Sequence, residues 1–481
     1  MVINKKMFLD AVSCTTFSWK NAKCTNNDSE PFDYEKELKI VEGNEIGERA
    51  RKIFPNGVLI EEKNIDIAVY QTKQAITKNS IKVLFEAAFF VDGLITRPDI
   101  LVRQDDYSFE MIEVKSSIND KPELIDDMAY TGMVLKLGGL NVNKYSLMLI
   151  SKDYRLGMND EQMFKKIDHT EEVKNKIIEM VELKSTIKAA LVSDIQPEST
   201  LTITCRNCDY LEECFPKYAT VDSIFNLPRL SEKQFIELTK VGIISIKNIP
   251  DIYRLSDTQS FARDSIRADK LIKMDKLSSM LKLIKWPIYY LDFESMMTAI
   301  PLFERTAPYT QIPTQFSIHL CEILGTPVAH YEYIADKNGD CREKLADALI
   351  SYLGESGTVF SYSSFEKTII KGLIELFPAK EIKLNSIIDR IFDLENIVKC
   401  TYHPNYFGSY SIKKTLPALV PSLNYDDLDI NNGGMAMSVF ALMIKGMIEE
   451  RKEKEIRQAL LNYCERDTYA MVKLHEELSK I

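Results

Sequence analysis

The chain has 481 residues, of which 45% are hydrophobic and 27% charged; this composition is ordinary for a globular protein, and the length predicts two or three domains. The net charge of −10 argues against a protein that coats nucleic acid without specificity, although a local basic channel remains compatible with it. No apolar run approaches the roughly 20 residues needed to span a bilayer, and residues 1–10 lack the apolar segment of a secretory signal. These features predict a cytoplasmic protein without a membrane partner.

The first half of the chain predicts one helix and two strands that carry charged side chains. Residues 43–50 are expected to be helical. Asp99 leads into a strand, and the following strand, at 109–115, carries Glu113 and Lys115 two positions apart. Because side chains on a strand alternate between its faces, these two point the same way. Two carboxylates and an ammonium so placed could hold a divalent ion and orient an attacking water.

The segments Pro98-Asp99 and Glu113-Val114-Lys115 resemble the PD-(D/E)XK nuclease motif. The resemblance implies that Asp99 and Glu113 hold a metal ion. It also implies that Lys115 orients water or offsets charge on the transition state. The alternative is a solvated edge strand, because Glu-x-Lys occurs by chance in many strands.

Two positions depart from this pattern. Many relatives carry a metal-binding histidine on the first helix, where Gly47 stands here. A later helix is predicted to begin at Asp127. Many relatives carry a glutamine on that helix, at the position of Thr131 in this chain. Glu48 or Glu86 could compensate for the missing ligand.

Three of the nine cysteines form a tight cluster, Cys205, Cys208 and Cys214. Two cysteines separated by two residues can bind one metal centre, and disulfides are not expected in a cytosolic protein. The nearest candidates for a fourth thiolate are Cys14 and Cys24. The remaining cysteines have no such spacing and are expected to be small core or surface residues.

One early cysteine followed by a late Cys-x2-Cys-x5-Cys resembles the iron–sulfur RecB-like nucleases. In these proteins a 4Fe-4S cluster ties the chain start to the end of the nuclease domain. The resemblance implies that the ligands are Cys14, Cys205, Cys208 and Cys214. A structural zinc at the same thiolates, or reduced buried cysteines, are the alternatives.

Residues 221–284 are predicted to be a helical connector. Within it, residues 235–250 predict a helix, a glycine turn and a second helix. This pattern is loosely similar to a helix-hairpin-helix, whose glycine turn approaches a phosphate backbone. An ordinary connector is the alternative.

The second half of the chain carries separate acidic residues. Residues 286–294 predict a buried strand that ends with Asp292 and Glu294 on one face. A second strand, at 357–363, leads into a helix whose first turn holds Glu366. Acids placed at strand ends in this way could share a pair of divalent ions.

A late helix sets Tyr463 and Asp467 four residues apart, on one face. With the acids on the earlier strands, this order resembles the DEDD exonucleases of the DnaQ/RNase H-like fold, in their tyrosine variant, across residues 285–481. Relatives usually place an aspartate where Glu366 stands. Asp393 is a rival or additional acid.

This second resemblance implies a two-metal mechanism at Asp292, Glu294, Glu366 and Asp467, with Mg²⁺ or Mn²⁺ ions about 4 Å apart. One ion would activate a water, and the other would stabilise the leaving 3′ oxygen. Tyr463 would position the water, because a phenol with a pKa near 10 orients better than it deprotonates. Hydrolysis from a 3′ end is expected.

The expected fold class is therefore multidomain α/β. It comprises a restriction-endonuclease-like domain at 1–220, a connector at 221–284 and an RNase H-like domain at 285–481. The whole resembles a bacterial family with this domain order. The expected function is a metal-dependent nuclease whose partner is DNA or RNA with single-stranded ends. Two alternatives stay open: the first domain grips nucleic acid without cutting it, or both sites are inactive in an interaction protein.

Overall fold

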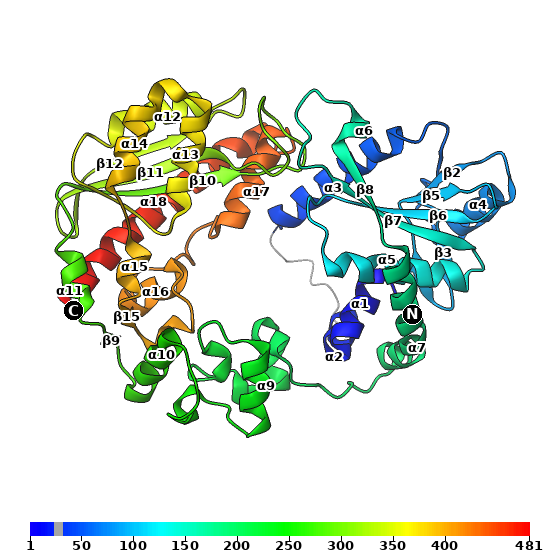
Figure 1. Ribbon diagram of the computed structural model, residues 1–481, viewed down its shortest axis with the longest axis horizontal. Coiled ribbons are helices and arrows are strands. Elements are labelled where there is room, and N and C mark those ends of the chain that lie inside the picture. The colour runs from blue at the N-terminus through cyan, green and yellow to red at the C-terminus, as the bar shows by residue number, and fades with distance from the viewer. Residues whose placement is uncertain (24–31) are drawn as a thin grey trace. The chain divides into compact units, whose positions relative to one another are not determined.

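The computed structural model describes residues 1–23 and 32–481, which fall into two compact units (Figure 1). The first unit comprises 1–200 with 298–310, and the second comprises 201–297 with 311–481. The chain is mixed α/β and multidomain, as expected. Cys24 lies outside the described residues. Among the helices that the structure describes, none combines the length and the apolar character that a bilayer crossing requires.

The first unit is built on a six-stranded mixed sheet with the order β1-β2-β5-β6-β7-β8. Ile100, the first residue of β5, pairs with Ile112 of β6, and Phe85 of β2 pairs with the same Ile100. The residues next to these pairs, Glu86, Asp99 and Glu113, therefore meet at one end of the central strands. The strands are β1 (Val58–Leu59), β2 (Val83–Phe85), β5 (Ile100–Arg103), β6 (Phe109–Lys115), β7 (Val142–Ile150) and β8 (Phe164–Asp168), with a separate hairpin of β3 (Phe89–Val91) and β4 (Leu94–Thr96).

Helices cover both faces of this sheet. Met111 and Leu147 pack with residues of α1, α5 and α7 on one face, and Ile112 and Met148 pack with Ala50 of α3 on the other. Glu113 and Lys115 share the register of Met111, so they point toward α1 and α5. The helices of this unit are α1 (Lys5–Ser13), α2 (Thr15–Lys23), α3 (Tyr34–Lys52), α4 (Ile65–Thr77), α5 (Pro122–Leu137), α6 (Asp160–Met163) and α7 (Thr170–Val192).

Helix α5 begins at Pro122 and not at Asp127, where the sequence predicted its start. Proline is favoured at the first helical position because its fixed φ suits the helix and its missing N–H is not needed there. Asp127 consequently lies one turn inside the helix.

The second unit is built on a five-stranded sheet with the order β12-β11-β10-β13-β14. The first three of these strands are antiparallel, whereas β10, β13 and β14 are parallel. The strands are β10 (Ile288–Met296), β11 (Ile312–Ile323), β12 (Thr326–Ile334), β13 (Thr358–Ser361) and β14 (Ile391–Asp393), with a separate pair of β9 (Ile272–Lys273) and β15 (Thr401–Tyr402).

The two faces of β10 are covered by different helices. Leu291 and Phe293 belong to a hydrophobic core with residues of α12, α13 and α14, whereas Asp292, one position on, contacts Cys464 of α18. The helices of this unit are α8 (Leu211–Cys214), α9 (Glu232–Lys240), α10 (Asp257–Ala268), α11 (Lys276–Leu281), α12 (Arg342–Tyr352), α13 (Phe365–Leu376), α14 (Glu381–Arg390), α15 (Leu394–Val398), α16 (Ile412–Leu419), α17 (Gly433–Ile444) and α18 (Glu450–Lys480). Six short 3-10 helices accompany them: η1 (Ile203–Asn207), η2 (Pro216–Tyr218), η3 (Ile224–Asn226), η4 (Ile246–Asn248), η5 (Pro378–Lys380) and η6 (Pro404–Tyr406).

The prediction of a second helix within 235–250 was wrong. Helix α9 and a left-handed turn at Gly242 (φ +78°) are present, but the next element is only the 3-10 turn η4. Pro250 restricts the residue before it to extended backbone, and Ile249 accordingly has φ −66° and ψ 118°. The turn therefore cannot continue as an α-helix.

Candidate functional site

An acidic cluster lies between β10 and α18 in the second unit. Asp292 and Glu294 come from one face of β10, and Asp467 comes from the middle of α18. One carboxylate oxygen from each lies within 4.8 Å of the other two. The period of two in the strand aims both β10 acids at the helix that covers this face.

Burial raises the pKa values of Asp292 and Glu294 well above their usual range, and the neighbouring acids raise them further. Burial also raises the pKa of Asp467, to about 6, although a hydrogen bond from Tyr425 and the ammonium of Lys413 oppose the rise. Like charges held together in a buried place resist ionisation. The cluster therefore favours a bound cation when its acids are ionised.

Glu366 is a fourth acid at the same end of the sheet. It lies in the first turn of α13, directly after β13, and is only 2% exposed. Its Oε2 has no hydrogen-bond partner among the described residues. Burial raises the pKa of Glu366 to about 8, and the charge of Glu366 in turn raises the pKa of Asp292. It lies outside the group of three whose oxygens are within 4.8 Å.

Asp393 serves as a backbone cap in this structure. Its Oδ1 accepts hydrogen bonds from the N–H groups of Ser363 (3.1 Å) and Glu395 (2.9 Å), and its Oδ2 accepts one from Asn396 (3.1 Å). Ser363 has φ +123°, a strained backbone for a residue with a side chain. Asp393 thereby holds the turn that leads from β13 to Glu366.

Tyr463 lies one helical turn before Asp467 on α18. Burial raises its pKa, and the neighbouring acids raise it further, so the phenol stays protonated. The Nζ of Lys413 lies 5.1 Å from the centre of the Tyr463 ring and 5.3 Å from that of Tyr425. Tyr425 donates a hydrogen bond to Oδ1 of Asp467 at 2.5 Å.

The sequence had identified neither Lys413 nor Tyr425 as part of a site. Tyr425 precedes Asp467 by 42 residues, and it lies in a segment between two helices, α16 and α17. No periodic pattern links positions so far apart, so only the folded chain reveals them.

The first unit brings Asp99, Glu113 and Lys115 to one end of its sheet. Oε1 of Glu113 accepts hydrogen bonds from Lys5 (2.7 Å) and Lys115 (3.0 Å). Oε2 of Glu113 is buried and has no hydrogen-bond partner within the described part of the chain. Asp127 of α5 pairs with both ammonium groups, at 3.2 Å in the case of Lys5.

Opposite pKa shifts distinguish the acids of this first site. Burial would raise the pKa of Glu113, but Lys5 and Lys115 more than offset it and hold the pKa at about 2. Burial raises the pKa of Asp99 well above its usual range, and Glu113 raises it further, despite a 2.6 Å hydrogen bond from the N–H of Val114. Burial also raises the pKa of Glu86. For Asp99 and Glu86, burial thus outweighs the effect of the cations nearby.

A cavity of about 470 Å³ opens beside these acids. Asp99, Glu86 and Lys115 line it, together with Gly47 and Glu48 of α3. Position 47 therefore faces the site but carries no side chain that could bind a metal. Glu86, at φ +54°, is held in the left-handed region that side chains rarely adopt.

Thr131 is buried within α5 and is not among the residues that line this cavity. It shares a 3.2 Å hydrogen bond with Thr96 and donates another, at 3.3 Å, to the carbonyl of Asp127. Its hydroxyl is thus used within the core of the first unit.

The clustered cysteines lie at the start of the second unit. Cys205 and Cys208 are joined by a 3.1 Å hydrogen bond from the N–H of Cys208 to the carbonyl of Cys205, and Cys214 ends α8. All three are half-buried. Cys14 ends α1 in the first unit, and its sulfur accepts a 3.4 Å hydrogen bond from the N–H of Phe17. The remaining described cysteines are buried, consistent with the expected core role: Cys321, Cys341, Cys400 and Cys464.

The model of a domain of unknown function, DUF2779, matches residues 289–411 of the chain. The matched segment begins within β10, so it contains Asp292, Glu294 and Glu366. It ends before α16, so it leaves out Tyr463 and Asp467.

Three curated relatives, each titled as an uncharacterised protein, match part of the chain. The protein UU173 of Ureaplasma parvum is 27% identical over 217 residues, which is 40% of this chain and 31% of that protein. The MG366 homologue of Mycoplasma pneumoniae is 23% identical over 42% of this chain and 33% of its own length. MG366 of Mycoplasma genitalium is 26% identical over 40% and 32%, respectively. The chain spans about a third of the length of these relatives.

Among solved structures, that of SSO0001 is similar at 16% sequence identity, covering 44% of this chain and 93% of that one. Its TM-score is 0.17, so this likeness carries no argument about the fold or the site.

Proposed function

We propose that this chain is a metal-dependent nuclease whose principal active site is the acidic cluster of the second unit. The convergence of Asp292, Glu294 and Asp467 within 4.8 Å is the observation that carries the proposal. An all-oxygen ligand set suits hard divalent ions such as Mg²⁺ and Mn²⁺. The orphaned Oε2 of Glu366 adds a fourth acid at the edge of this site. Mg²⁺ or Mn²⁺ would there activate water and stabilise the departing oxygen of a phosphodiester.

The surrounding residues have roles that fit this reaction. Tyr463, with its raised pKa, keeps its proton and can orient the attacking water by a hydrogen bond. The ammonium of Lys413 lies over the ring of Tyr463. It also lowers the pKa of Asp467, so that this acid stays ionised at a lower pH. The backbone of Gly433 lies beside the cluster, since a Cβ there would be 3.9 Å from Oε2 of Glu294. This is the positive start of α17, which favours a negatively charged phosphate.

The proposed substrate is an end of DNA or RNA, attacked from its 3′ terminus, and single-stranded ends are favoured. The proposed fold of residues 285–481 is RNase H-like, and that of residues 1–220 is PD-(D/E)XK-like, with residues 221–284 as a connector. The RNase H-like assignment is supported by the position of the acids: Asp292 and Glu294 lie on a strand of a mixed sheet, and Asp467 lies on the helix that covers it.

For the first unit two functions compete, a second nuclease site and a nucleic-acid-binding scaffold. The orphaned Oε2 of Glu113 and the raised pKa of Asp99 support metal-dependent cleavage. The scaffold is supported by Lys5, whose ammonium already compensates Glu113 at 2.7 Å, and by the absence of a ligand at Gly47. Separate Lys115→Ala and Asp292→Ala variants discriminate between them. Cleavage that survives only Lys115→Ala would assign the first unit a binding role.

The decisive assay uses labelled single- and double-stranded DNA and RNA with Mg²⁺, Mn²⁺ or EDTA. Asp292→Asn is expected to lower cleavage at 3′ ends by at least about 100-fold, because a metal ligand is lost. Asp389→Asn changes an exposed acid of α14 and serves as the matched control. Equal cleavage by both variants, or cleavage that survives EDTA, would refute the proposed site.

We further propose a 4Fe-4S cluster on Cys14, Cys205, Cys208 and Cys214, with structural zinc at the same thiolates as the alternative. The Cys-x2-Cys spacing and the half-buried state of these thiols support it. Freshly purified protein should be brown and contain iron. Cys14→Ser should remove the colour, whereas Cys24→Ser should keep it. Colourless protein that contains zinc would replace the cluster with the zinc site.

A further inference from the structure

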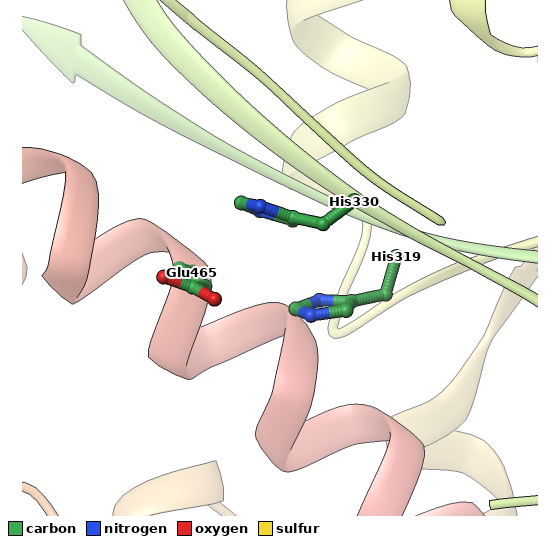
Figure 2. Close-up of side chains that lie close together, drawn as sticks. All are labelled: His319, His330 and Glu465. Carbon is green, nitrogen blue, oxygen red and sulfur yellow. The ribbon is translucent and has the colours of Figure 1, made fainter. Parts of the chain in front are cut away.

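A second group of metal-ligating side chains lies in the second unit, apart from the acidic cluster. His319 of β11 and His330 of β12 stand directly opposite each other in the antiparallel pair. Glu465 of α18 faces them, as Figure 2 shows. One ligand atom from each of the three lies within 4.8 Å of the other two.

Hydrogen bonds to neighbouring hydroxyls fix both imidazole rings. Nδ1 of His319 is 2.8 Å from Oγ1 of Thr468, and Nε2 of His330 is 2.9 Å from Oγ of Ser317. The two hydroxyls are themselves 2.8 Å apart. Partners of this kind orient the histidines of metal sites, because a bond at one ring nitrogen aims the other at the ion.

The Glu465 carboxylate has no direct bond to either ring. Within residues 1–23 and 32–481, no hydrogen bond or ion pair joins it to His319 or His330. The three side chains come from three different elements; the two imidazole rings stack with their centres 4.5 Å apart, and the carboxylate of Glu465 approaches them from the helix. An ion bound at the point between them would satisfy this arrangement.

The donor set indicates which ion this is. Mg²⁺ and Ca²⁺ prefer oxygen ligands throughout, as the acidic cluster offers, whereas two imidazole nitrogens and one carboxylate oxygen suit Zn²⁺. Burial and, to a smaller extent, the neighbouring His330 lower the pKa of His319 to about 4, so the ring is neutral and able to bind metal.

We propose that His319, His330 and Glu465 form a binding site for Zn²⁺, distinct from the Mg²⁺ or Mn²⁺ site of the acidic cluster. Three protein ligands leave the fourth tetrahedral position for water. The ion would link the β11–β12 hairpin to α18 next to Asp467, since Glu465 and Thr468 flank that residue on the helix.

The experiment is a Zn²⁺ titration of the chelator-treated full chain by calorimetry. The test variant is Glu465→Gln, which removes the carboxylate charge at an exposed position, and the matched control is Glu455→Gln, exposed on the same helix. The wild type and Glu455→Gln should each bind one equivalent of Zn²⁺ more than Glu465→Gln does. If Glu465→Gln still binds this equivalent, its affinity should be lower by at least about tenfold. His330→Gln should behave like Glu465→Gln. Isotherms that superimpose for all four proteins would overturn the proposal.

Two further arms separate this site from the other metal centres. Co²⁺ should give visible bands that Glu465→Gln loses and that Cys205→Ser keeps, because this site has no thiolate ligand; bands that depend on Cys205 alone would refute it. The Asp292→Asn variant should retain the zinc equivalent, so failure of the nuclease proposal and failure of this one are distinguishable. Displacement of the ion by a modest excess of Mg²⁺ would also overturn the assignment.

Discussion

Glu366 offers the sharpest test of the acidic cluster, because its burial lowers the stability of the metal-free protein once its carboxyl group ionises. Burial raises its pKa from 4.5 to about 8. An acid whose pKa is higher in the folded than in the unfolded protein stabilises the fold while it is protonated. This contribution is complete at a pH below the pKa of the unfolded chain, and it is lost as the pH rises through the pKa of the folded protein. At about 1.4 kcal/mol for each tenfold change in acidity, the loss between pH 5.5 and 8.5 is roughly 3 kcal/mol in the free energy of unfolding.

The Glu366→Gln variant keeps the shape of the side chain and removes the titration. In the presence of EDTA, the wild-type free energy of unfolding should fall between about pH 5.5 and 8.5 by roughly 3 kcal/mol more than that of the variant. Urea denaturation, followed by tryptophan fluorescence, measures this difference. A Trp19→Phe background leaves Trp286, in the second unit, as the single reporter, because the chain has only two tryptophans.

Mg²⁺ extends the same test to metal binding. At pH 8.5 it should raise the stability of the wild type more than that of Glu366→Gln. Glu375→Gln, exposed on the same helix α13, should follow the wild type throughout. If wild type and Glu366→Gln show the same dependence on pH, the carboxyl of Glu366 does not titrate between pH 5.5 and 8.5, and its burial does not raise its pKa to about 8.

Three other outcomes are expected. Tyr463→Phe should lower kcat roughly 100-fold with little change in KM, because in the proposed reaction the phenol orients water and does not bind substrate; a change confined to KM would contradict this proposed role. Lys413→Gln should shift the pH profile of kcat/KM upward by roughly 1 pH unit, since the lysine lowers the pKa of Asp467, whereas the exposed Lys414→Gln should leave the profile unchanged. Lys5→Ala should destabilise the first unit by about 3 kcal/mol in urea denaturation at pH 7, because it leaves the buried Glu113 with one partner fewer; Lys6→Ala, with a 74% exposed side chain, should cost little, and equal effects would argue against a buried pair.

Local patterns in the chain were sufficient to predict several elements of the fold. The alternation of side chains on a strand placed Asp292 with Glu294 and Glu113 with Lys115, and the strands β10 and β6 carry these pairs. The helical spacing of four likewise placed Tyr463 and Asp467 on one face of α18. These features depend on backbone periodicity alone, which sequence directly expresses.

Other predictions from the sequence were wrong because neighbouring residues changed where a helix begins or ends, and nearby groups use the oxygens of one candidate ligand. The predicted second helix after Gly242 became a 3-10 turn because of Pro250, and α5 began at Pro122 and not at Asp127. Asp393 was a candidate metal ligand in the sequence, but three hydrogen bonds from nearby groups use its oxygens as a cap.

The order of residues along the chain is sufficient to place residue types at their local spacing: acids two apart on strands, a tyrosine and an aspartate one helical turn apart, and cysteines at metal-binding intervals. The distant groups that complete each candidate site become visible only in the folded chain. Lys5 reaches Glu113 across 108 positions, and the pairing of His319 with His330 depends on the register of a β-hairpin. Such contacts result from how sheets and helices pack, and packing joins residues whose separation along the chain follows no period.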